Sequence, residues 1–279
     1  MARLILCADD YGLAPGVSRA ILRLIVANRL TATSCMSLGA AWPDHAAALK
    51  PYADAADIGL HLTLTDHRPL GPMPVLAPDG ALPPVGALLA RALAGRVDRT
   101  ELAHELERQL EAFERALGRP PAFIDGHQHV HQFPVVRDVV IDLWRRRLSR
   151  SSAWMRVCDE SWISTLRRGI DAPKAWVITG LGRRLRRRAA AAGITTNDRF
   201  SGIHDFSGRT PYATLFEGFV REAGPGTLLV MCHPGEVDAE LVAADPVTTA
   251  REEELRFFEG PEFPALLARH GLTLARLRA

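Results

Sequence analysis

The chain has 279 residues, of which 47% are hydrophobic and 24% are charged, and its formal net charge at pH 7 is +2. These values are average for a soluble globular protein, and the small charge gives no reason to expect a nucleic acid as a partner. No stretch reaches the roughly 18 uninterrupted apolar residues of a membrane span, so we expect no transmembrane segment.

The cysteines and the first residues favour a cytoplasmic protein. The four cysteines are Cys7, Cys35, Cys158 and Cys232. Each lies apart from the others among apolar residues, which is typical of a buried reduced thiol and not of a disulfide framework or a CxxC zinc site. The opening residues MARLILCADD contain too short an apolar run for a signal peptide and end in two aspartates.

Two runs of basic residues stand out in a chain whose net charge is close to zero. They cover Arg145–Arg147 and Arg183–Arg188. Such runs usually form the solvated face of a helix, and the alternative is a surface that binds an anionic partner or a membrane.

Short apolar runs alternate with segments of helical periodicity along the chain. In the first half we expect strands at residues 3–7, 31–38, 57–64 and 122–125, a helix from Pro15, and a helix over 100–117 that stops at GRPP. In the second half we expect helices at 134–147, 174–192, 210–222 and 248–258, strands at 153–158 and 226–232, an uncertain strand or loop at 199–206, and a helical turn before a last strand near 272–277.

About six or seven such alternations indicate a parallel sheet with helices between its strands. A closed, TIM-barrel-like (β/α) barrel with an imperfect ring is favoured over an open doubly wound sheet, because no GxGxxG or GxxxxGK[ST] motif follows a strand. The chain shows no clear repeat or linker, so we expect one domain over residues 1–279.

One long insertion, residues 66–98, is rich in proline and glycine. Its prolines are Pro69, Pro72, Pro74, Pro78, Pro83 and Pro84. This density excludes a continuous helix or a central strand. Because long loops in compact domains usually form lids or substrate walls, we expect this loop to border the functional site.

Polar side chains follow four of the expected strands. They are Asp9 and Asp10, His61, Asp125 with His127, and His233. In a (β/α) barrel the carboxyl ends of the strands share one face, and that face carries the active site. These residues are distant in sequence, but the fold predicts that they converge.

Each of these residues also has an ordinary structural explanation. The two aspartates suit a helix cap, His61 suits a hydrogen-bonded core position, and His233 in HPG suits a turn. In DGHQHVHQFP, a strand continuing to His131 would place three imidazoles on one face; otherwise only His127 lies at the strand end, and His129 and His131 lie in the loop around the pocket. Convergence on one face favours the functional interpretation for the set.

The chemistry of the set suits a metal ion. One carboxylate and two neutral imidazoles bind a divalent cation and leave positions open for water and substrate. Adjacent Asp9 and Asp10 point in different directions, so one can bind the cation while the other accepts a proton from an activated water.

The motifs ADDYGLAPGVSRAI, IGLHLTLT, DGHQHVHQFP, TNDRFSGIHDF and HPG, in this order, resemble the YdjC-type carbohydrate deacetylases over nearly the whole chain. That family includes chitooligosaccharide deacetylases and relatives that act on hopanoid glycolipids. The resemblance implies a deformed (β/α) barrel that uses a divalent metal to hydrolyse N-acetyl groups of amino sugars. The chain departs from the family pattern at Tyr11, where phenylalanine is commoner, and at Gly126 and Gln128 inside the histidine cluster.

By motif position, the resemblance implies that Asp10, His61 and His127 bind the metal and that Asp9 is the general base. His233, placed after a late strand, is the candidate general acid. Four further residues are candidate substrate contacts, namely Tyr11 through its backbone N–H, His129, His131 and Arg156, the last with a surface ion pair as the alternative.

Several points stay open at this stage. Imidazole ligands favour zinc or another transition ion, whereas magnesium is commonly assigned in the family. The substrate is a small carbohydrate or a glycolipid, and a homo-oligomer is compatible with the sequence. The competing functions are hydrolysis of a phosphoester or of a non-sugar amide, a non-catalytic sugar- or metal-binding barrel, and a purely structural metal.

Overall fold

The computed structural model describes residues 2–161, 172–221 and 223–277. All eight of its strands belong to one sheet, and every pairing is parallel. Seven of them follow one another in the order β5-β4-β3-β2-β1-β7-β6, and the eighth, β8, lies off this path. The strands are β1 (Ala2–Tyr11), β2 (Ala32–Cys35), β3 (Asp57–Leu62), β4 (Phe123–Gly126), β5 (Trp154–Met155), β6 (Arg199–Ser201), β7 (Thr227–Cys232) and β8 (Leu272–Leu274). The last of them, β8, pairs with the first residues of β1.

The sheet curls until its two ends meet at a narrow seam. Met155 in β5 forms a single parallel bridge with Thr196, three residues before β6. Beside that bridge, the Asn197 side chain accepts a hydrogen bond from the N–H of Val157 (2.8 Å) and donates one to its carbonyl (2.9 Å). The predicted deformed (β/α) barrel is confirmed, and the alternative of an open doubly wound sheet is wrong.

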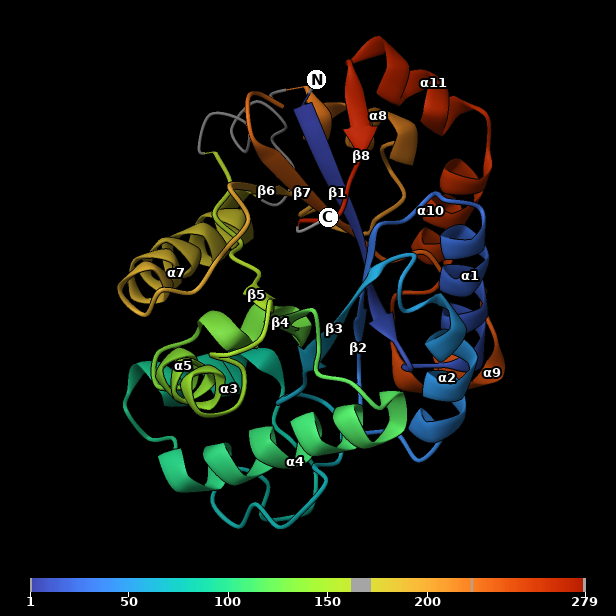
Figure 1. Cartoon of the computed structure of the whole chain (residues 1–279). Coiled ribbons are helices and arrows are strands. Elements are labelled where there is room, and N and C mark those ends of the chain that lie inside the picture. Colours follow the sequence, from blue (N-terminus) through green and yellow to red (C-terminus); the bar gives the residue numbers. More distant parts are fainter. Residues whose placement is uncertain (1, 162–171, 222, 278–279) are drawn as a thin grey trace.

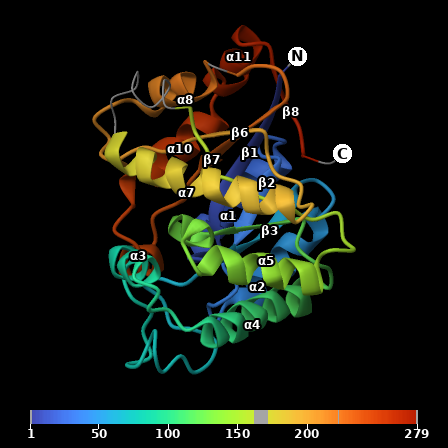
Figure 2. The same cartoon turned by 90° about the vertical axis from the view of Figure 1, so that its left-hand side faces the viewer.

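Helices pack around the outside of the sheet (Figure 1). They are α1 (Pro15–Val26), α2 (Trp42–Leu49), α3 (Val85–Leu93), α4 (Arg99–Leu117), α5 (Val136–Arg147), α7 (Ala172–Ala191), α8 (Tyr212–Val220), α9 (Ala239–Ala244), α10 (Thr249–Glu259) and α11 (Glu262–Arg269), with short 3-10 helices η1 (Lys50–Tyr52) and η2 (His127–Gln132). Helices α4, α5 and α7 run side by side along one flank (Figure 2). None of the described helices is long and apolar enough to cross a membrane.

Most predicted elements are present, with shifted ends. Strand β1 continues past Cys7 to Tyr11, and β5 has only two residues. Helix α5 begins at Val136 and not at Pro134, because Val135 has a positive φ of 67° that does not fit a helix. Helices α2 and α9 were not predicted, since their short sequences carry little periodicity.

The proline-rich insertion is a loop only in its first half. Helix α3 begins at Val85, directly after the last proline of the run, Pro84. The loop before α3 is fixed by buried polar side chains of α4: Glu101 accepts hydrogen bonds from the N–H groups of Val75 and Leu76 (2.8 and 3.0 Å), and Glu105 accepts one from Leu70 (3.0 Å). The N–H groups of this loop have no neighbouring strand to pair with, and the buried carboxylates of α4 accept their hydrogen bonds instead.

Alternation along the strands separates two apolar clusters. In β1, Leu4 and Leu6 face the helices, whereas Ile5 and Cys7 face the barrel interior. The interior cluster also contains Phe123, Trp154, Phe200, Leu229 and Met231. All four cysteines are buried and free, as predicted.

Candidate active site

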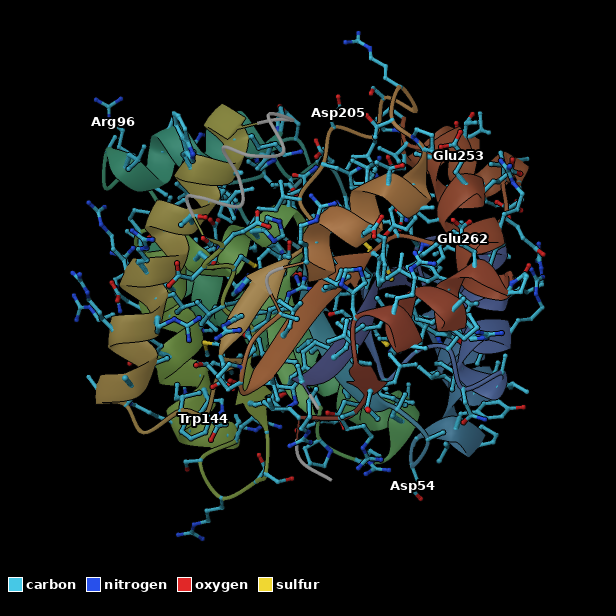
Figure 3. All side chains as sticks on the ribbon, turned by 90° about the horizontal axis from the view of Figure 1, so that it is seen from above. Asp54, Arg96, Trp144, Asp205, Glu253 and Glu262 are labelled. Atoms are coloured by element: carbon cyan, nitrogen blue, oxygen red, sulfur yellow. The ribbon has the colours of Figure 1, made fainter. Side chains whose placement is uncertain are left out.

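The inward-facing positions of the strands change from apolar to polar at their carboxyl ends. A polar residue lies two positions after an inward-facing residue on six strands. The inward-facing residues are Cys7, Ala32, Gly59, Phe123, Trp154 and Met231, and the polar residues that follow them are, in the same order, Asp9, Ser34, His61, Asp125, Arg156 and His233. Alternate residues of a strand share a face, so each of these polar side chains lies one step above an inward-facing position of the same strand. Charged residues such as Asp54 and Arg96 lie at the periphery instead (Figure 3). The polar layer therefore closes the carboxyl end of the barrel interior.

Three of the predicted residues come together as a possible cation site. Asp10, His61 and His127 each offer one ligand atom, and these atoms lie within 4.8 Å of one another. His127 Nδ1 is 3.0 Å from Asp10 Oδ1, and His61 Nε2 is 3.4 Å from the same oxygen. The structure thus brings together the three residues that the motifs indicate as metal ligands.

Asp125 and Ser34 fix the orientation of His61. His61 Nδ1 lies 2.7 Å from Asp125 Oδ1 and 3.0 Å from Ser34 Oγ, and Ser34 also donates a hydrogen bond to Asp125. This pairing leaves Nε2 facing Asp10, as in metal sites where a carboxylate holds the distal nitrogen of a histidine ligand. Burial opposes a positive charge on His61, but Asp125 and Asp10 outweigh it and raise the pKa of His61 to about 10.

Asp9 is held by Arg156 through two parallel hydrogen bonds of 2.7 and 2.8 Å. The Arg156 side chain has no exposed surface, and its guanidinium also lies 2.8 Å from Asp125 Oδ2. Burial opposes the charge of Asp125, but Arg156 and His61 outweigh it and lower the pKa of Asp125 to about 2. Arg156 therefore lies behind Asp9, and the structure places it neither in a surface ion pair nor within reach of a substrate.

His233 lies next to Asp9, with Nε2 3.9 Å from Asp9 Oδ2. Its backbone N–H donates to Glu254 Oε2 (2.5 Å), and its ring meets the Phe206 ring edge to face, with centroids 5.1 Å apart. Burial lowers the pKa of His233 to about 4, although Asp10 and Asp9 act in the opposite direction. The imidazole is therefore neutral near pH 7.

The other two histidines of the cluster lie away from the cation site. Gln128 and His129 have positive φ angles (51° and 61°), so the chain turns into η2 and no strand continues to His131. His131 Nε2 lies 2.9 Å from the carbonyl oxygen of Arg156, and His129 Nδ1 lies 3.4 Å from Cys158 Sγ. Both rings are buried in these contacts.

Tyr11 also points away from the site. Its ring is buried, and its hydroxyl donates a hydrogen bond to the carbonyl of His45 (2.7 Å). The backbone of Tyr11 pairs with Cys35 in β2, and its carbonyl accepts a hydrogen bond from Met36 (2.8 Å), so its N–H belongs to the sheet and the predicted substrate contact through Tyr11 is wrong.

The proline-rich loop reaches the site at its first residues. Asp66 accepts a hydrogen bond from the Gln128 amide (3.1 Å), and the His67 ring meets the His127 ring with centroids 5.8 Å apart. This part of the loop borders the site, as predicted.

Arg251 is the main residue of the site that the sequence did not indicate. It is buried in α10, and its Nη2 donates to Asp10 Oδ2 (2.7 Å) and to Asp245 Oδ2 (2.5 Å). Burial opposes the charge of Asp10, but Arg251 and His127 outweigh it and hold the pKa of Asp10 well below its usual range. The sequence TTAREEELRFFEG gives no signal for this role, because Arg251 opens a run of four charged residues that is typical of a solvated helix face.

The charges and donor atoms of the site fit a divalent cation. Arg156 is shared by Asp9 and Asp125, and Arg251 by Asp10 and Asp245. Each group therefore has one negative charge more than its arginine compensates. The raised pKa of His61 shows that a positive charge is favoured at this point, and a bound divalent cation would supply it in place of the imidazole proton. Cys7, Asp9 and Asp125 also lie within 4.8 Å of one another, but Arg156 already binds both of those carboxylates.

The sequence and the fold were compared with those of known proteins. The sequence model of the family described as YdjC-like protein matches residues 3–269. A human protein named carbohydrate deacetylase is 30% identical over an alignment of 296 residues that covers 99% of this chain and 90% of that protein. A chitooligosaccharide deacetylase of Yersinia pestis (strain Pestoides F) is 30% identical over 274 residues, covering 97% of this chain and 96% of that protein.

The fold also resembles that of a solved structure. The crystal structure of a proposed cellobiose-phosphate cleavage protein from Enterococcus faecalis V583 superposes with a TM-score of 0.74 over 99% of this chain and 97% of that one, at 20% identity. At that identity the likeness supports the fold alone. The family match over nearly the whole chain shows that this protein belongs to the YdjC-like family.

Proposed function

We propose that this protein is a metal-dependent carbohydrate deacetylase that removes the acetyl group from an N-acetylated amino sugar and releases acetate. The observation that carries the proposal is the meeting of Asp10, His61 and His127, with donor atoms within 4.8 Å, beside Asp9 and His233. The two relatives at 30% identity, named as deacetylases of carbohydrates and of chitooligosaccharides, supply the substrate class.

Asp10, His61 and His127 would hold the cation. A divalent ion bound there supplies Lewis acidity, which polarises a carbonyl oxygen and lowers the pKa of water toward neutrality. Two imidazoles and one carboxylate suit zinc or another transition ion, while the family resemblance implies magnesium.

Asp9 is the proposed general base. Arg156 binds both of its oxygens, so the carboxylate cannot rotate, yet each oxygen retains a lone pair that can accept a proton. Asp9 takes a proton from the attacking water as the new C–O bond forms at the acetamide carbon.

His233 is the proposed acid that completes the reaction. Its imidazole is neutral at rest, because its pKa lies at about 4. His233 Nε2 lies 3.9 Å from Asp9 Oδ2, which is too far for a direct proton transfer, so a bridging water would carry the proton from Asp9 to His233, which then donates it to the sugar nitrogen. Protonation lets the C–N bond break with a neutral amine as leaving group, and the products are acetate and the free amino sugar.

The test is acetate release from short chitooligosaccharides and other N-acetylated sugars, before and after treatment with a chelator. We expect release that the chelator abolishes and that added divalent metal restores. Phosphate release from sugar phosphates in parallel assays, without acetate from any N-acetylated sugar, would assign the site to a different hydrolase.

Two substitutions separate the proposed roles. Asp10→Ala should remove metal binding and activity together, whereas Asp9→Asn should bind metal normally and lose about 10³-fold in turnover, within the range of general base catalysis. If Asp9→Asn kept a near-normal rate, Asp9 would not be the base.

A further inference from the structure

Arg251 lies close to the cation site without being able to bind substrate. Its side chain is only 2% exposed and reaches from α10 to Asp10. The backbone carbonyl of Arg251 accepts a hydrogen bond from Gly235 (3.1 Å), which fixes this helix against the HPG turn. Glu253, two residues further along α10, points to the periphery instead (Figure 3).

The guanidinium is fixed on several sides. Nε donates to the carbonyl of Val247 (3.1 Å), and Nη2 is shared between Asp245 Oδ2 (2.5 Å) and Asp10 Oδ2 (2.7 Å). Asp245 and Val247 both lie in the turn just before α10, so the arginine is oriented by residues of its own segment. Of these three partners, Asp10 alone comes from a distant part of the sequence.

The two oxygens of Asp10 face different partners. Oδ1 faces His127 Nδ1 at 3.0 Å and His61 Nε2 at 3.4 Å, whereas Oδ2 faces Arg251. Asp10 also has a positive φ of 66°, a conformation that costs free energy unless neighbouring contacts enforce it. The ion pair with Arg251 is a contact of that kind.

We propose that Arg251 is a positioning residue for the cation site. It binds Oδ2 of Asp10, and so directs Oδ1 alone toward a divalent cation shared with His61 and His127. This inference rests on the cation site in the proposed function. It adds that the carboxylate is a one-oxygen ligand because a buried arginine occupies its second oxygen.

Positioning and simple electrostatics predict opposite effects when Arg251 is removed. A positive charge near a cation repels it, so electrostatics alone predicts that Arg251→Met binds a divalent cation more tightly. Loss of positioning predicts weaker binding, because groups that orient metal ligands typically contribute about 10–100-fold to metal affinity. The direction of the change therefore separates the two effects.

The experiment titrates chelator-treated protein with Co²⁺ and follows its visible absorption and the heat of binding. We expect Arg251→Met to bind Co²⁺ about tenfold or more weakly, with an altered absorption spectrum, and Arg251→Lys to lie between it and the wild type. Arg256→Met, at an exposed arginine of the same helix, is the matched control and should bind as the wild type does.

The outcomes distinguish this proposal from the proposed function. Wild-type protein that takes up no Co²⁺ would overturn the cation site and the role of Arg251 together. Normal uptake by the wild type, with equal or tighter binding and an unchanged spectrum in Arg251→Met, would overturn the role of Arg251 alone. If Arg251→Met does not fold, as judged by circular dichroism, Arg251→Lys decides, and wild-type affinity and spectrum in that variant would overturn the proposal.

Discussion

The barrel interior has two layers built from the same strands. In the lower layer Phe123 and Trp154 stack with ring centroids 4.3 Å apart, and Trp154 donates to Asp57 at the start of β3 (3.3 Å). In the upper layer, two residues further along the same strands, Asp125 and Arg156 form an ion pair. Apolar packing fills one layer, and charge compensation holds the other.

The comparison shows how one barrel separates stability from chemistry. Stacked rings in the lower layer need no partner charges, so they stabilise the fold by burial and contact. The carboxylates of the upper layer are stable in the interior only because buried arginines compensate them. We therefore expect substitutions in the lower layer to reduce stability without changing turnover, and substitutions of the upper-layer arginines to leave buried carboxylates without a compensating charge.

The largest expected effect comes from breaking the upper layer at Arg156. Arg156→Met leaves Asp9 and Asp125 buried without their shared cation, and we expect the free energy of unfolding to fall by about 3–5 kcal/mol. Urea denaturation followed by circular dichroism measures the change. Arg156→Lys should lose less, because an ammonium keeps the charge but cannot bind Asp9 through two parallel bonds. A loss below about 1 kcal/mol in Arg156→Met would show that these carboxylates need no compensation.

Breaking the lower layer should have a smaller effect of a different kind. Phe123→Leu removes the stacked ring over Trp154, and we expect a loss of about 1–2 kcal/mol in the free energy of unfolding. Turnover per folded molecule should stay within about twofold of the wild type, because no upper-layer group is changed. Acetate release, normalised to the folded fraction, checks this. A large fall in turnover at full folding would mean that the two layers are not separable.

The residues that the sequence predicted to converge, and that the structure brings together, lie where strong local signals coincide. Asp10 and His61 each follow an apolar run at the end of an expected strand, and the barrel brings such ends together whatever the loops between them do. His127 follows the same rule. For these residues, the order of elements alone was enough to predict a shared site.

The remaining site residues depend on packing that no local pattern shows. Arg251 and Glu254 belong to a run of four charged residues in α10, and only the way α10 packs on the HPG turn decides which of them are buried. His129 was uncertain because the positive φ angles of η2 cannot be inferred from three alternating histidines. The buried position of Arg156 was also missed, because both alternate sets of residues in AWMRVC are otherwise apolar and do not show which side faces inward.

The smallest expected effect sharpens the comparison within one strand. Ser34 faces the upper layer and contacts His61 Nδ1 (3.0 Å), whereas its neighbour Thr33 faces the helices and donates to the carbonyl of Ala8 (2.9 Å). Ser34→Ala should lower Co²⁺ affinity by about tenfold, because His61 loses one of the groups that orient it.

Thr33→Ala serves as the matched control for that substitution. It also removes one buried hydroxyl from β2, so it should cost a similar free energy of unfolding, about 1 kcal/mol. Its Co²⁺ affinity should equal that of the wild type, because Thr33 contacts no residue of the cation site. Equal losses of Co²⁺ affinity in both variants would mean that the effect comes from a weakened strand. A loss confined to Ser34→Ala would mean that the inward hydroxyl holds His61 in place for the cation.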